Sequence, residues 1–273
     1  MSERVRRPRG IPLRALVPNA VTALALCCGL TGVRYAISAA NGVEGDWEKA
    51  VAAIIVAAVL DGMDGRIARA LKGQSRFGAE LDSLSDVIAF GVSPAIILYL
   101  WSLQYFPRFG WIFALAHAVC AALRLARFNA AIDVEEQPHK SAGFLTGVPA
   151  PAGAGLTLLP VYLWLWSGEE IFREIYVVAP WAALIAFLMV SNLATFSWGS
   201  LRLRSRVRLW AIVVIALIGG ALFSAPWPTL SIAAMVYAAL IPASIYAYGK
   251  IRRQRAKGGV RAASPPGVGE PTP

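Results

Sequence analysis

Long hydrophobic stretches, separated by short polar ones, dominate the chain from about residue 17 onward. Eight of them approach the roughly 20 residues that a helix needs to cross a bilayer. They lie near 17–40, 48–71, 81–102, 109–131, 148–166, 176–198, 207–225 and 228–248. The pattern predicts an all-α polytopic membrane protein of about eight transmembrane helices.

Composition agrees with this interpretation and bounds the domain organisation. The chain has 273 residues, of which 57% are hydrophobic and only 15% charged, an apolar excess that water-soluble domains do not carry. We expect a basic cytoplasmic N-terminal segment at 1–15 and one transmembrane catalytic domain at 16–250. Residues 251–273 are basic and then rich in Pro and Gly, and we expect a disordered tail there.

The basic residues predict the orientation, because Lys and Arg are retained on the cytoplasmic side. They gather before the first span, at 72–76, at Lys140, at 202–208 and after residue 249, whereas the opposite loops are acidic. Both termini are therefore expected in the cytoplasm. The net charge of +10 is accounted for by topology and by contact with anionic lipid heads, so we do not expect nucleic-acid binding. The three cysteines, Cys27, Cys28 and Cys120, lie inside predicted spans and are expected to pack as small apolar residues.

Four acidic residues stand apart from the other twelve because they lie inside or at the mouth of apolar spans. These are Asp61, Asp64, Asp82 and Asp86. A carboxylate at membrane depth is costly unless it is paired, which makes it a candidate functional residue. The spacings of three and four residues place each pair on one helix face. A short loop joins the two helices, so all four carboxylates are expected to meet at one height in the cytoplasmic half.

Four facing carboxylates repel one another, and a divalent cation relieves that repulsion. Oxygen ligands without His or Cys favour magnesium or manganese, and a pair of such ions about 4 Å apart is a common apparatus for phosphoryl transfer. Gly62, Gly65 and Ala68 leave room for a ligand, and Arg69 needs an anionic partner such as a phosphate. These features favour a diphosphate site, although glycines also promote helix packing. A cation path in a transporter is the alternative.

The aspartates belong to a longer pattern that resembles the signature of the CDP-alcohol phosphatidyltransferase family. The pattern is Asp61-x-x-Asp64-Gly65-x-x-Ala68-Arg69, eight residues, then Gly78-x-x-x-Asp82-x-x-x-Asp86. The resemblance implies the CDP-alcohol phosphotransferase fold, a homodimer, and four aspartates holding two divalent ions, Mg²⁺ or Mn²⁺. It also implies that Asp86 takes the proton from the attacking alcohol. The residues that it assigns to the CDP-lipid are Asn19, Thr22, Gly65, Ala68, Arg69, Ser75 and Gly78. Asn19 and Thr22 could equally be a helix cap.

The choice of alcohol depends on other parts of the chain. The stretches ALRLARFN at 122–129, FLTGVPAPAGAG at 144–155 and LMVSN at 188–192 resemble bacterial family members that use serine. The stretch TFSWGS at 195–200 departs from their pattern. The resemblance therefore implies an enzyme of the inner membrane that faces the cytoplasm and acts on CDP-diacylglycerol and L-serine, releasing CMP.

Basic side chains near the cytoplasmic end of the fourth span agree with serine as the substrate. Arg124 and Arg127 share a helix face near Asn129, and Lys140 follows in the next loop. A zwitterionic amino acid needs a cation for its carboxylate, although the two arginines could instead reach toward the interface. Inositol phosphate, glycerol phosphate or choline remain alternative alcohols, and a non-enzymatic membrane protein is a further alternative. The two histidines, at 117 and 139, receive no role.

Overall fold

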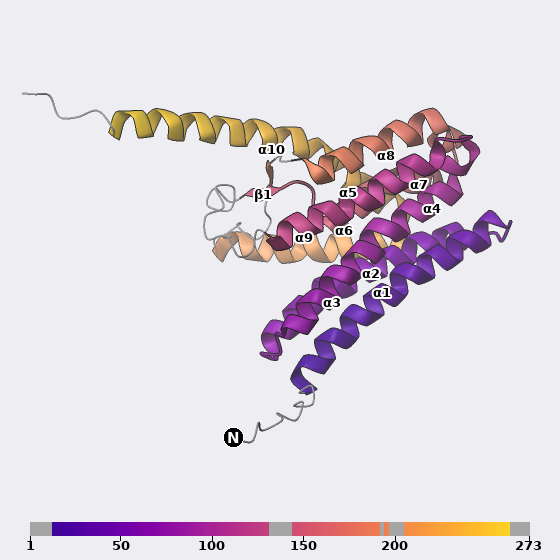
Figure 1. The fold of residues 1–273 in the computed structure, drawn as a ribbon, viewed down its shortest axis with the longest axis horizontal. Coiled ribbons are helices and arrows are strands. Elements are labelled where there is room, and N and C mark those ends of the chain that lie inside the picture. Colours follow the sequence, from indigo (N-terminus) through magenta and orange to yellow (C-terminus); the bar gives the residue numbers. More distant parts are fainter. Residues whose placement is uncertain (1–12, 131–143, 192–193, 197–204, 263–273) are drawn as a thin grey trace, which may run out of the picture.

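The computed structural model describes residues 13–130, 144–191, 194–196 and 205–262 of the chain. Most of these residues form helices that lie side by side in a bundle (Figure 1). The first half contains α1 (Leu13–Ala40), α2 (Asp46–Ala70), α3 (Arg76–Asp86), η1 (Val87–Val92), α4 (Ser93–Trp101), η2 (Leu103–Tyr105) and α5 (Gly110–Ala130). The second half contains β1 (Phe144–Thr146), α6 (Ala150–Thr157), α7 (Leu159–Ser167), η4 (Glu170–Arg173), α8 (Ile175–Val190), β2 (Ala194–Phe196), α9 (Ser205–Ser224) and α10 (Pro226–Ala262).

The predicted all-α class is confirmed, with a short antiparallel pair of strands as the exception among the described residues. In this pair Leu145 of β1 lies opposite Thr195 of β2. The first predicted span is α1 and the second is α2, and the two pack along each other as an antiparallel pair. The turn between them contains Gly42 and Gly45 with φ of +92° and +75°, a conformation that glycine adopts without steric cost.

The third and fifth predicted spans are not single α-helices. The third consists of α3, a π-helical segment η1, and α4. Pro94 at the start of α4 has no backbone N–H, so a regular α-helical ladder cannot pass through it. The fifth is divided at Leu158 into α6 and α7, two residues before Pro160.

The later helices also differ in length from the predicted spans. Helix α8 ends at Val190, earlier than the predicted 198, because Ser191 adopts an extended conformation with ψ of 154°. Helix α10 continues to Ala262 and projects beyond the bundle (Figure 1). The basic part of the predicted tail is therefore helical as far as Ala262, which the sequence interpretation missed, and residues 263–273 lie outside the described part of the chain.

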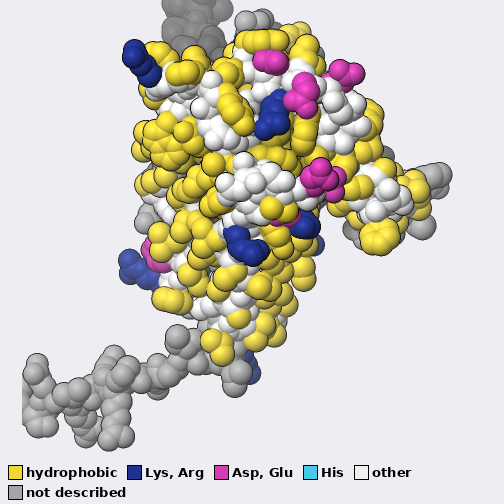
Figure 2. Space-filling view, turned by 90° about the vertical axis from the view of Figure 1, so that its right-hand side faces the viewer, with side chains coloured by type: hydrophobic (Ala, Val, Ile, Leu, Met, Phe, Trp, Pro, Cys, Tyr) yellow, Lys and Arg dark blue, Asp and Glu magenta, His cyan; other side chains and the backbone are white. Residues whose placement is uncertain are grey.

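The interior of the bundle is apolar, and so is much of its outer surface. Trp101, Phe90 and Leu98 are fully buried in the main core, whereas many other large apolar side chains are exposed. Hydrophobic side chains dominate the space-filling view (Figure 2). Within the described residues, four helical segments are long and apolar enough to cross a membrane: Leu16–Ala40, Arg76–Trp101, Gly110–Ala130 and Pro226–Ser244. Because apolar surface of this extent is stable only in lipid or under a partner, the chain is a membrane protein.

Candidate active site

The acidic residues of α2 and α3 converge, as their spacing predicts. One carboxylate oxygen from each of Asp61, Asp64 and Asp82 lies within 4.8 Å of the other two. Asp64 is 6% exposed, while Asp61 and Asp82 are partly buried. Three hard oxygen ligands at this spacing, without a nitrogen or sulfur ligand among them, fit a magnesium- or manganese-like cation.

Asp86 is the last residue of α3 and lies beside the cluster. Its carboxyl group lies against that of Asp61. Its Oδ1 atom is buried and has no hydrogen-bond partner among the described residues. Two acidic groups in contact away from water need a proton or a cation between them. The Oδ1 atom of Asp86 therefore has capacity to bind a cation or to accept a proton.

Thr22 of α1 orients one of the carboxylates. Its Oγ1 donates a hydrogen bond of 2.6 Å to Oδ2 of Asp64 and lies 3.2 Å from the Pro18 carbonyl oxygen. The Ser85 hydroxyl of α3 donates to the backbone oxygen of Thr22 over 3.3 Å. Thr22 thus joins three helices at the acidic cluster, a role that the sequence did not reveal because the partners lie 42 and 63 residues away.

A cleft of about 360 Å³ opens beside the cluster, between α1, α2, α3 and the loop that joins α2 to α3. Its lining contains all seven residues that the family resemblance assigns to the CDP-lipid: Asn19, Thr22, Gly65, Ala68, Arg69, Ser75 and Gly78. Asp64 and Asp82 lie on its inner wall. Sequence reasoning missed Pro18, Gly73, Gln74 and Ala79, which also line it. Gly73 and Gln74 lie in the short loop between the two aspartate pairs, and this position in the sequence could have identified them as lining residues.

The small residues of the cleft have different reasons for being small. A Cβ atom added to Gly78 would lie 2.7 Å from Oδ1 of Asn19, so the close approach of α3 to α1 requires glycine there. A Cβ atom on Gly65 would meet nothing within 4 Å. Ser75 caps α3, because its hydroxyl accepts the backbone N–H of Gly78 over 3.0 Å. Gly65 therefore leaves open space in the cleft, whereas Gly78 allows α3 to pack closely against α1.

Arg69 lies on the cleft with its side chain exposed, so a phosphate that enters the cleft can be the anionic partner that the sequence interpretation expects. An arginine at the rim of a cleft offers planar N–H donors to an anionic ligand that enters.

The residues predicted to hold the alcohol divide into separate groups. Arg124 of α5 lies within electrostatic range of Asp86 and of Tyr237 in α10, and its buried Nε has no hydrogen-bond partner among the described residues. Asn129 donates from Nδ2 to the Ser83 hydroxyl over 2.9 Å, which ties α5 to α3. Tyr237 was not found from the sequence, because nothing in the local pattern of α10 marks it.

Arg127 makes hydrogen bonds that the sequence did not indicate. Its guanidinium donates to the carbonyl oxygens of Val190 over 2.8 Å and of Ser191 over 3.2 Å. These carbonyls end α8, where a cation is favourable. Arg127 therefore holds the end of α8 with both terminal nitrogens. Lys140 and His139 lie outside the described residues.

These features together define a class of protein: apolar helices that enclose an acidic, metal-compatible cluster beside an anion-accessible cleft are the apparatus of phosphate-group transfer at a membrane. The model of the family "CDP-alcohol phosphatidyltransferase" matches residues 15–191. This range is well over half of the chain and includes the cluster and the cleft, so the chain belongs to the CDP-alcohol phosphatidyltransferase family.

Curated relatives extend the similarity beyond the family region. The chain is 36% identical over 240 residues to a protein of Mycobacterium bovis named CDP-diacylglycerol–serine O-phosphatidyltransferase, covering 88% of this chain and 81% of the relative. A protein of the same name from Mycobacterium leprae is 35% identical over 246 residues, covering 90% and 79%. One from Helicobacter pylori is 32% identical over 208 residues, covering 74% and 81%.

Proposed function

We propose that this chain transfers the phosphatidyl group of CDP-diacylglycerol to the hydroxyl group of L-serine, forming phosphatidylserine and releasing CMP. The observation that carries the proposal is the meeting of three signature carboxylates within 4.8 Å beside a cleft lined by every residue assigned to the CDP-lipid. The names of the curated relatives support serine as the alcohol.

Two divalent cations, Mg²⁺ or Mn²⁺, would be held by Asp61, Asp64, Asp82 and Asp86. The fit rests on the hard oxygen donors of the cluster and on the buried Oδ1 of Asp86, which has no partner among the described residues. When bound, such ions neutralise the carboxylates and stabilise the negative charge that develops on the diphosphate during transfer.

The side chains of the chain itself then bind, orient and move a proton. The serine hydroxyl oxygen forms a bond to the lipid-side phosphorus, and its proton passes to a carboxylate oxygen of Asp86. The bond from that phosphorus to the bridging oxygen breaks, and CMP leaves through the cleft. Thr22 keeps Asp64 in a fixed orientation through its 2.6 Å hydrogen bond, and Arg69 donates to the diphosphate from the rim.

Serine would lie between the cluster and α5. Arg124, whose Nε makes no hydrogen bond among the described residues, takes the serine carboxylate on this proposal. Asn129 lies nearby and ties α5 to α3, and Lys140 follows in the connecting segment. Arg127 supports the serine site indirectly, because its guanidinium donates hydrogen bonds to the carbonyls at the end of α8.

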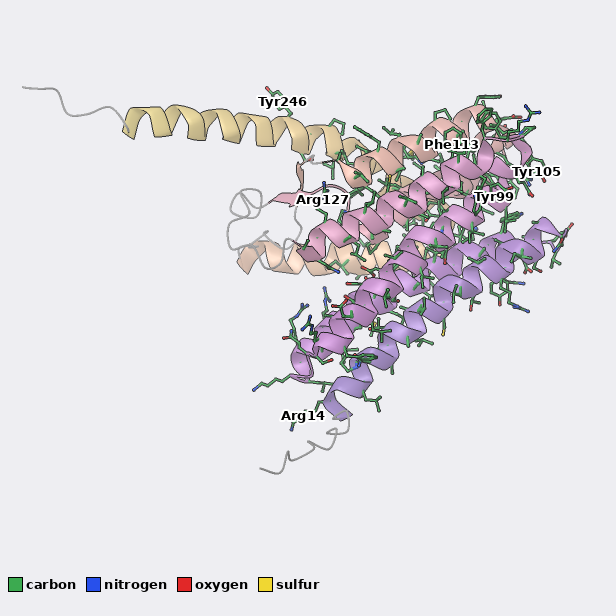
Figure 3. The ribbon with its side chains drawn as sticks, viewed as in Figure 1. Arg14, Tyr99, Tyr105, Phe113, Arg127 and Tyr246 are labelled. Atoms are coloured by element: carbon green, nitrogen blue, oxygen red, sulfur yellow. The ribbon has the colours of Figure 1, made fainter. Side chains whose placement is uncertain are left out.

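The proposal includes the topology expected from the sequence: eight spans in the region 16–250, both termini in the cytoplasm, and the active site at the cytoplasmic side of the inner membrane. Arg14 and Arg127 lie toward one end of the bundle, and Tyr99 and Tyr105 toward the other (Figure 3). The position of Arg14 supports the assignment, because it follows the basic N-terminal segment, and Lys and Arg are retained on the cytoplasmic side. A homodimer follows from the family resemblance.

The experiment is a CMP-release assay on the purified chain in detergent, with CDP-diacylglycerol and one alcohol at a time. We expect CMP and phosphatidylserine in equal amounts with L-serine, and dependence on Mg²⁺ or Mn²⁺. Asp64→Asn is the matched inactive control. Release with inositol phosphate, glycerol phosphate or choline in place of serine would reassign the alcohol, and no release with any of them would overturn the function.

A further inference from the structure

His117 of α5 is a buried polar residue that the proposed chemistry does not use. It is 1% exposed, and its Nδ1 lies 3.1 Å from the hydroxyl oxygen of Thr157 at the end of α6. The ring also lies against the backbone carbonyl of Phe90. Its Nε2 atom is buried and completes no hydrogen bond among the described residues. A buried polar atom in such a position is costly unless it has a partner.

Phe90 belongs to the π-helical segment η1, which begins directly after Asp86. In a regular α-helix the Phe90 carbonyl would accept the N–H of the residue four positions later, and that residue is Pro94, which has none. The N–H and the hydroxyl of Ser93 both bond to the Ile88 carbonyl instead. The Phe90 carbonyl therefore lacks the donor that a regular α-helix would supply, and it can accept a hydrogen bond from a neighbouring helix.

Ala89 and Gly91 of η1 pack tightly against two neighbouring helices. A Cβ atom on Gly29 of α1 would lie 2.8 Å from Cα of Ala89, and one on Gly91 would lie 2.9 Å from Cβ of Ala121 in α5. One residue more or less in a helical turn rotates the adjoining segment by about 100°. Because this packing holds Ala89 and Gly91 in place, a change in the number of residues in the π-helical turn would displace Asp86, which directly precedes the turn.

We propose that His117 is a positioning residue for Asp86, acting through η1. The neutral ring accepts a hydrogen bond from the Thr157 hydroxyl at Nδ1, which leaves its Nε2–H to form, in the working enzyme, the hydrogen bond to the neighbouring Phe90 carbonyl that is incomplete in this structure. This bond holds the π-turn in the register that directs Asp86 toward the serine hydroxyl. The role of Asp86 as base rests on the proposed function, whereas the bond between His117 and Phe90 does not.

Two amide variants separate positioning from packing. In His117→Gln the amide nitrogen reaches the place of Nε2, whereas in His117→Asn the shorter amide reaches only the place of Nδ1 and its hydrogen bond with Thr157. We expect His117→Gln to keep kcat close to that of the unmodified chain. We expect His117→Asn and His117→Leu to lose about tenfold to a hundredfold in kcat, the scale of a small misplacement of a reacting group. KM for both substrates should stay unchanged.

Equal kcat in the Gln and Asn variants, at equal binding of CDP-diacylglycerol, would assign His117 to packing and overturn the proposal. An independent readout needs no turnover. The chain contains two histidines, so ¹⁵N-histidine labelling of a His139→Asn variant reports His117 alone. We expect the tautomer with the proton on Nε2 and a hydrogen-bonded shift at that nitrogen. The opposite tautomer would overturn the proposal even if the chain is active, and absence of activity in the unmodified chain would contradict the proposed function alone.

Discussion

Gly65→Ala places a single methyl group in the cleft and tests whether the lipid nucleotide occupies it. In the free protein the new Cβ atom meets nothing within 4 Å, so the substitution does not disturb packing. Alanine in place of a helical glycine stabilises a helix by about 0.5–1 kcal/mol. Once a ligand fills the cleft, an added methyl group costs about 1–3 kcal/mol, which corresponds to roughly fivefold to 150-fold weaker binding.

Gly62→Ala is the matched control for this experiment. Gly62 lies one turn earlier on α2, and its added Cβ atom also meets nothing within 4 Å. It is not part of the cleft lining. Both variants should unfold at the same or a slightly higher temperature than the unmodified chain, and only Gly65→Ala should raise KM for CDP-diacylglycerol. Unchanged lipid affinity in Gly65→Ala would refute the assignment of this cleft to the nucleotide.

Three further expectations follow from the acidic cluster and from α5. Asp61→Asn should lower turnover more than tenfold in the CMP-release assay while the protein still inserts and folds, and retention of a tenth of the activity would contradict the metal assignment. Asp86→Asn should keep its affinity for CDP-diacylglycerol in an equilibrium binding measurement but fail in transfer, because an amide cannot accept the hydroxyl proton; a loss of lipid affinity equal to that of Asp61→Asn would make Asp86 chiefly a structural ligand. Arg124→Ala should weaken serine use roughly tenfold to a hundredfold, as expected for a charge-assisted hydrogen bond of about 1.5–3 kcal/mol, with partial rescue by Arg124→Lys; an unchanged KM for serine would remove Arg124 from the alcohol site.

The part of the site that could be predicted from sequence depends on short-range geometry. Asp61 and Asp64 are three residues apart and Asp82 and Asp86 four apart, so helix periodicity fixes each pair on one face. The five-residue loop between α2 and α3 then brings the faces together. The hydrogen bond from Thr22 to Asp64 joins residues 42 positions apart, and no local pattern encodes such a contact.

The same distinction applies to the helices. Apolar composition located the helical segments, because burial in lipid or core needs only hydrophobic side chains. It could not locate the division at Leu158 or the π-helical turn before Pro94, since Pro is tolerated within apolar helices when neighbours replace the lost hydrogen bond. The contacts of Arg127 could not be predicted either. Its partners are the last carbonyls of α8, and the sequence did not show that α8 ends at Val190. The count of eight spans stays a prediction.

The cleft is lined entirely by residues 18–82, a continuous early part of the chain. During synthesis, which proceeds from the N-terminus, α1 to α3 can assemble the nucleotide-binding half before the later helices are made. The residues proposed to hold the alcohol come afterwards, on α5 and beyond. Substitutions in those later helices can therefore change the acceptor without altering the part that binds the donor, which gives one catalytic module the means to evolve toward different head groups.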